Sequence, residues 1–145
     1  MSDKVITKAP SYEDWERYTD SLNRCMSRGG FLDRFYELFL SASDEIRKKF
    51  DGTDFRKQKQ MLGASFLTMM SAINGDKVAM ADLQERAARH SKADLDIKPE
   101  WYEVWLNCLI QAVAETDSGY TDAVGVSWRN VMGPGIDFMV SQYES

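Results

Sequence analysis

Apolar residues recur at helical spacing along nearly the whole chain. In the first such stretch they follow Ser11 at intervals of three or four, at Trp15, Tyr18, Leu22 and Met26. This spacing places them on one face of a helix. Ser11 is a typical N-cap residue, with Asp14 three positions on. The pattern therefore predicts an amphipathic helix that ends at Gly29–Gly30.

Turn-forming residues divide the rest of the chain into further helices. The predicted helices cover residues 31–42, 44–50, 54–73, 78–91, 99–116 and 121–143. The fifth of these, 99–116, is apolar on nearly all sides, which predicts a central, buried helix. Gly133–Pro134–Gly135 should kink or interrupt the last one. Because no segment alternates with a period of two, we expect an all-α fold of six to eight helices.

Composition narrows the class of protein. A chain of 145 residues with 43% hydrophobic residues has the size and core of one domain. The net charge of −5 and the lack of a basic tract argue against a nucleic acid or an anionic membrane as partner. No apolar run reaches the ~20 residues of a membrane span. Two distant cysteines, Cys25 and Cys108, indicate reduced packing residues in a cytoplasmic protein.

His90 is the only histidine. It shares a helix face with Leu83 and Ala87, at the end of the 78–91 helix. A lone histidine makes a poor zinc or copper site, because these metals need three or four protein ligands. Haem is the exception, since the porphyrin supplies four nitrogens and one axial histidine suffices. Taken alone, this helix favours the ordinary interpretation, a partly buried histidine bonded to a backbone carbonyl.

Three segments, in order, resemble the bacterial single-domain globins and the globin domain of flavohaemoglobins. They are FYELFLSASDEIRKKFD, QKQML, and LQERAARH followed by Ile97, Pro99 and WYEVW. The resemblance covers residues 11–143. It implies a globin fold around a haem pocket, with residues 1–10 as an N-terminal extension and 11–145 as a single globin domain.

The resemblance also implies a site. His90 would be the proximal ligand of the iron of haem b, and Phe50 would stack on the porphyrin. Tyr36 and Gln58 would be the distal ligand-binding residues, with Leu62 one turn beyond Gln58. Further contacts to the cofactor would come from Arg86 and Arg89, as partners of the haem propionates, and from the pocket-lining Ile97, Trp101 and Trp105.

The distal pair has a physical rationale. Gln58 lies in an otherwise apolar stripe, and burying an amide without a partner costs about 1–3 kcal/mol. Tyr36 lies among phenylalanines, and a buried phenol usually finds a partner. A diatomic gas would give both a partner, and each hydrogen bond would contribute about 0.5–1.5 kcal/mol. A structural Tyr–Gln pair bonded to backbone remains the alternative.

Tyr102 resembles the tyrosine that, in flavohaemoglobins, bridges the proximal histidine to a glutamate on the last helix. The matching segment here, FMVSQYES, has no glutamate at the expected position. That absence argues against peroxidase-like activity, because such a carboxylate makes the histidine more anionic.

The implied function is reversible binding of O2, NO and CO by a monomer or homodimer. With a separate reductase, such a protein could oxidise nitric oxide to nitrate, so its status as an enzyme stays open. Two alternatives remain. One is a gas sensor that signals through a partner protein, and the other is a non-haem globin-fold module that binds proteins.

Overall fold

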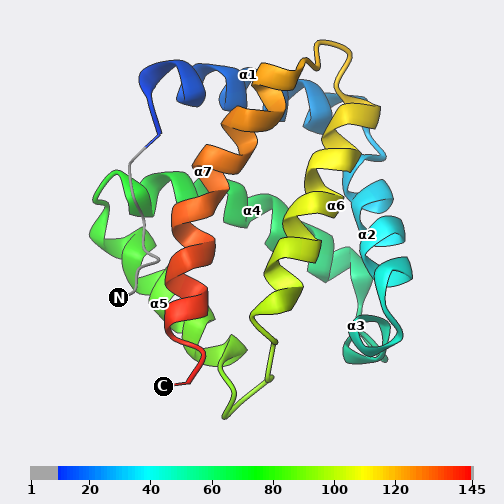
Figure 1. The fold of residues 1–145 in the computed structure, drawn as a ribbon, viewed down its shortest axis with the longest axis vertical. Coiled ribbons are helices and arrows are strands. Elements are labelled where there is room, and N and C mark those ends of the chain that lie inside the picture. The colour runs from blue at the N-terminus through cyan, green and yellow to red at the C-terminus, as the bar shows by residue number, and fades with distance from the viewer. Residues whose placement is uncertain (1–9, 145) are drawn as a thin grey trace.

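Seven α-helices make up residues 10–144, the part of the chain that the computed structural model describes (Figure 1). They are α1 (Tyr12–Arg28), α2 (Phe31–Ala42), α3 (Asp44–Lys49), α4 (Phe55–Ile73), α5 (Lys77–His90), α6 (Glu100–Thr116) and α7 (Asp122–Ser141). No strand occurs in that part of the chain. The all-α prediction is confirmed. The expected N-terminal extension lies outside the described residues except for Pro10, and the boundary of the globin domain stays a prediction.

Local sequence sets the helix ends. The Ser11 hydroxyl accepts the backbone N–H of Asp14, and the Asp14 carboxylate accepts that of Ser11, which completes a capping box. At the starts of α3, α4, α5 and α7, the side chains of Ser43, Asp54, Asp76 and Thr121 accept backbone N–H groups of the first turn. Gly29 and Gly30 have φ angles of 78° and 81°, a region that favours glycine, so the chain turns sharply between α1 and α2.

The helices pack in pairs around an aromatic core. α1 runs across the upper ends of α6 and α7, α2 packs along α6, and α4 packs along α5 (Figure 1). α5 otherwise packs against α7. At the centre, the buried Trp128 ring lies 4.7 Å from the Tyr18 ring and 5.7 Å from the Phe66 ring. Edge-on aromatic pairs of this kind add to the stability gained by burial.

Buried polar groups tie α1 to the other end of the chain. Asp117 accepts hydrogen bonds from Ser21, Arg24 and the backbone N–H of Gly119. The Trp128 indole N–H donates to the same Ser21 hydroxyl at 2.9 Å. Burial alone would raise the pKa of Asp117, but these donors outweigh it and the pKa is lowered.

Three expectations about the helices need correction. α7 continues through Pro134, so the predicted interruption is wrong, while the predicted kink stays a prediction; buried residues on both sides of the proline hold the helix on the core. Met26 is 46% exposed, in the last turns of α1, although its terminal methyl lies near Gly63 of α4. α6 is not buried all round, since Glu103, Asn107 and Gln111 form a solvent-facing side.

The Cys25 thiol is buried, Cys108 is partly buried, and both are free. Among the helices described, none combines the length and the apolar character needed to span a membrane.

Candidate functional site

His90 is the last residue of α5, and two neighbours fix its position. The Tyr102 hydroxyl, from α6, lies 3.3 Å from the Nδ1 atom of the imidazole. The backbone N–H of Ile97 donates to the His90 carbonyl at 3.1 Å, which closes the α5–α6 connection onto the helix end. With Nδ1 facing Tyr102, the remaining ring atom able to bind a metal is Nε2.

The surroundings of His90 favour the neutral imidazole. Burial lowers its pKa, and the nearby guanidinium groups of Arg86 and Arg89 lower it further, while Asp94 opposes them. A neutral ring offers a nitrogen lone pair, which is what a metal ligand requires. His90 is therefore in its ligating form at neutral pH.

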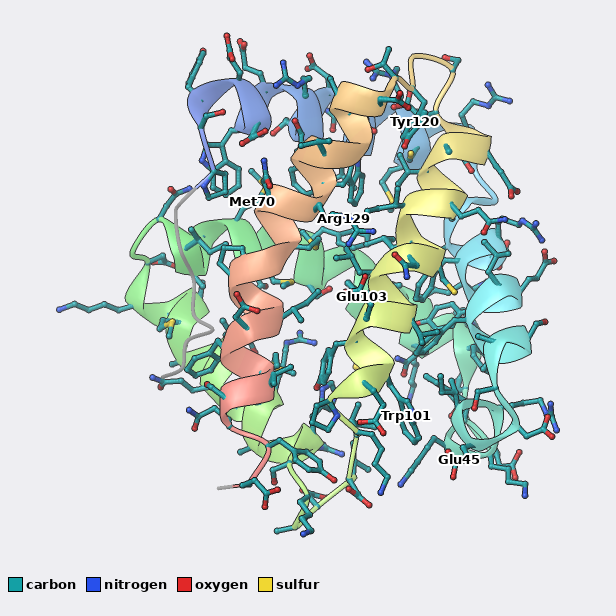
Figure 2. All side chains as sticks on the ribbon, in the orientation of Figure 1. Glu45, Met70, Trp101, Glu103, Tyr120 and Arg129 are labelled. Atoms are coloured by element: carbon teal, nitrogen blue, oxygen red, sulfur yellow. The ribbon has the colours of Figure 1, made fainter. Side chains whose placement is uncertain are left out.

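Large apolar side chains lie on α6, at the end of α3 and in the α5–α6 connection. Trp101 is buried at the end of α6 that lies nearer to α3 (Figure 2). Ile97, Phe50 and Trp105 pack on the core but stay partly exposed. The Phe35 and Trp105 rings lie 5.8 Å apart, which joins α2 to α6. These side chains offer apolar surface that a flat ligand could cover.

The predicted distal residues lie together on α2 and α4. The Tyr36 side chain is 6% exposed, and its ring lies 6.0 Å from that of Phe50 and 5.4 Å from that of Phe55. Burial raises the pKa of Tyr36 to about 12, and the neighbouring Gln58 amide opposes this shift more weakly. Tyr36 is therefore a protonated donor at neutral pH, beside a second donor. Leu62 is buried one turn further along α4.

A pocket of about 410 Å³ opens on the outer side of the same pair of helices. Tyr36, Leu40 and Phe55 line it, and the Lys59–Asp33 ion pair lies at its edge.

Sequence reasoning missed one cross-link at this site. The Lys49 ammonium donates to the Leu95 carbonyl at 2.7 Å, and this bond joins the end of α3 to the α5–α6 connection. The run RKKF, which ends at Phe50, shows that this segment is basic. The contact could not be predicted because Lys49 and Leu95 are 46 residues apart in the sequence. Leu95 itself is 40% exposed. Arg86 pairs with Asp82 at 2.9 Å on its own helix, and Arg89 is exposed.

The residues present fit a haem. Residues 10–144 hold no group of three or more His, Cys, Asp or Glu side chains able to bind a bare metal ion. One oriented, neutral histidine therefore suits a metal that brings its own ligands, as iron in a porphyrin does. The partly exposed rings of Phe50 and Trp105 and the side chain of Ile97 suit the flat, apolar macrocycle.

Comparisons with known proteins agree with the fold. No family model matches the chain. A flavohemoprotein of Bacillus cereus is 27% identical over 108 residues, which cover 74% of this chain but only 27% of that protein. The chain thus spans about a quarter of that relative's length. A crystal structure from Pseudomonas aeruginosa PAO1, described as structurally highly homologous to a human hemoglobin, is 39% identical with a TM-score of 0.86. The superposition covers 91% of this chain and 99% of that one.

These findings define an all-α protein with the globin fold. Within that class, the chain belongs to the bacterial globin family.

Proposed function

We propose that this protein is a haem-b globin that reversibly binds dioxygen and other diatomic gases, with His90 as the proximal ligand. The observation that carries the proposal is the single histidine, neutral and held at Nδ1 by Tyr102, which leaves Nε2 to face a metal. When bound there, haem would supply an iron centre able to bind a diatomic gas.

The protein's own residues would decide how tightly a gas is held. Tyr36 and Gln58 would donate an O–H and an N–H to the gas on the distal side. Dioxygen in such a site carries partial negative charge and gains from both donors. Carbon monoxide carries less charge and gains less. Each net hydrogen bond contributes about 0.5–1.5 kcal/mol, or roughly three- to twelvefold in affinity.

Oxidation of nitric oxide to nitrate would be a second use of the same site. Repeated turnover needs electrons, so this part of the proposal requires a reductase. The orientation of His90 by Tyr102 favours these haem functions over a non-haem protein-binding module, in which such an arrangement would have no use.

Stopped-flow measurement of dioxygen release from the ferrous protein tests the distal assignment. We predict that Tyr36→Phe and Gln58→Leu each raise the release rate about three- to twelvefold, because each loses one donor. Carbon monoxide release should change less. Tyr12→Phe and Gln60→Leu are matched controls, because they make the same chemical changes at exposed side chains of α1 and α4. Unchanged rates in both distal variants would refute the assignment.

A further inference from the structure

Asp96, in the α5–α6 connection, has an unusual backbone conformation. Its φ angle is 55°, and no other residue in 10–144 except glycines has a positive φ. A residue with a Cβ atom is crowded in this left-handed region, although aspartate enters it more readily than most. Contacts from the surrounding protein must therefore hold Asp96 in this conformation.

The conformation of Asp96 is coupled to the backbone of His90. Three successive N–H groups of the connection donate to carbonyls at the end of α5: Leu95 to Arg89 at 3.0 Å, Asp96 to Ser91 at 2.9 Å and Ile97 to His90 at 3.1 Å. The direction of the Ile97 N–H depends on the backbone angles of Asp96, because the two residues share a peptide bond. A change at Asp96 would therefore break the bond that closes the connection onto His90.

The turn that follows α7 supplies the contacts that hold Asp96. The Tyr143 hydroxyl donates to Oδ1 of Asp96 across 47 residues of sequence, and the Lys98 ammonium lies 3.2 Å from Oδ2. The Tyr143 carbonyl also accepts the backbone N–H of Lys92 at 2.8 Å. Tyr143 thus contacts the connection at two points, where the lower end of α7 lies beside it (Figure 1).

The bond between Tyr143 and Asp96 joins a phenol to a carboxylate. This bond lowers the pKa of Asp96, and Lys98 acts in the same direction. The same bond raises the pKa of Tyr143 to about 12. At neutral pH the carboxylate is therefore ionised and the phenol is protonated, which is the combination that gives the strongest hydrogen bond between them.

We propose that Tyr143 is a positioning residue for His90 and acts through the conformation of Asp96. This inference rests on the proposed haem function and adds the turn after α7 to the elements that hold the proximal ligand. Without the Tyr143 hydroxyl, Asp96 relaxes toward negative φ values and the Ile97 N–H turns away from the His90 carbonyl. The imidazole then takes up a wider range of orientations, limited by its remaining contact with Tyr102.

Amide hydrogen exchange tests the backbone step on the protein as purified, with or without haem. Tyr143→Phe removes only the hydroxyl, and we expect the Ile97 N–H to exchange about two- to tenfold faster. The Asp117 N–H, bonded to the Val113 carbonyl at 2.8 Å near the far end of α6, should change less. No change at Ile97, or an equal rise at both amides, would overturn the proposal.

The iron–histidine stretch in resonance Raman spectra of the ferrous holoprotein tests the step to the imidazole. Tyr143→Phe should broaden this band and raise the haem dissociation rate about two- to tenfold. Tyr12→Phe, at a side chain that is 75% exposed, is the matched control and should change neither. A Tyr143→Phe variant with a lower free energy of unfolding, but with the wild-type band and dissociation rate, would show a purely structural role and refute the proposal.

Two substitutions of Asp96 separate its conformation from its bond. Asp96→Asn keeps an acceptor oxygen and a residue that tolerates a positive φ, so it should retain the wild-type band. Asp96→Gly removes the acceptor and adopts the same φ without crowding. In the Asp96→Gly background, Tyr143→Phe should therefore have no further effect on either readout. A persisting effect there would exclude the route through Asp96.

Haem uptake separates this inference from the proposed function. Protein that takes up no haem, or that takes it up equally well as His90→Ala, refutes the proposed function itself. Protein that binds haem through His90, but shows the same band and the same Ile97 exchange in Tyr143→Phe as in the wild type, refutes only the positioning role.

Discussion

At the scale of single residues, the pairing of His90 with Tyr102 is the feature that shapes the site. Tyr102 packs against the apolar cluster of α4, α5 and α7, and burial raises its pKa, so that it stays protonated. A neutral phenol orients the imidazole without making it anionic, which fits gas binding better than cleavage of an O–O bond.

The contribution of Tyr102 can be measured directly. Tyr102→Phe keeps the ring in the apolar cluster but removes the hydroxyl at Nδ1. We predict a haem dissociation rate about three- to twelvefold higher, because one hydrogen bond that orients the ligand is lost. Transfer of haem to excess apomyoglobin measures this rate, and the iron–histidine stretch in resonance Raman spectra should shift with it. Tyr12→Phe should leave both unchanged, and a Tyr102→Phe variant that behaves like this control would contradict the role.

His90 could be singled out from the sequence because it is the only histidine and lies on an apolar helix face. The role of Tyr36, Gln58 and Phe50 came from resemblance, since a tyrosine or glutamine in an apolar stripe has several ordinary explanations. The contact of Lys49 with Leu95 could not be predicted, because no local pattern indicates which backbone carbonyl a lysine will reach.

At the scale of helices, apolar periodicity and caps predicted the elements to within one or two residues at most ends. The packing partners did not follow from these patterns. The bond between Ser21 and Asp117 joins residues 96 positions apart, and it is one of those that fix α1 against the end of α6. Pro134 shows the same limit, since the surrounding core overrides its tendency to break a helix.

Asp117 should make the free energy of unfolding depend on pH in the acid range. Its pKa is lowered in the folded state, so the stability it contributes is present above the unfolded value near 4 and is lost as the pH falls through the folded value. Asp117→Asn should lower the free energy of unfolding by about 1.5–3 kcal/mol at pH 7, because bonds from Arg24 and Ser21 to a charged group are weakened. Urea unfolding followed by circular dichroism measures this.

The difference between wild type and Asp117→Asn should shrink as the pH falls below 4. Asp20→Asn, an exposed aspartate on α1, is the control and should change stability by less than about 0.5 kcal/mol. If the difference in free energy of unfolding between wild type and Asp117→Asn did not change with pH, a role for the Asp117 charge would be contradicted.

At the scale of the whole molecule, the fold holds His90 against Tyr102 where α5 meets α6, and it places Tyr36 of α2 beside Gln58 of α4. These four residues come from four different helices, and only their order and separation in the sequence suggested that they form one site. The proposed function depends on haem being held by His90.

Titration of the purified protein with haem, followed by absorbance, tests that dependence most directly. The account predicts saturation at one haem per chain with an intense band near 400–430 nm, a marked change of that band and weaker binding in His90→Ala, and recovery of the band when free imidazole is added. The same band and the same affinity in His90→Ala as in the wild type would contradict it.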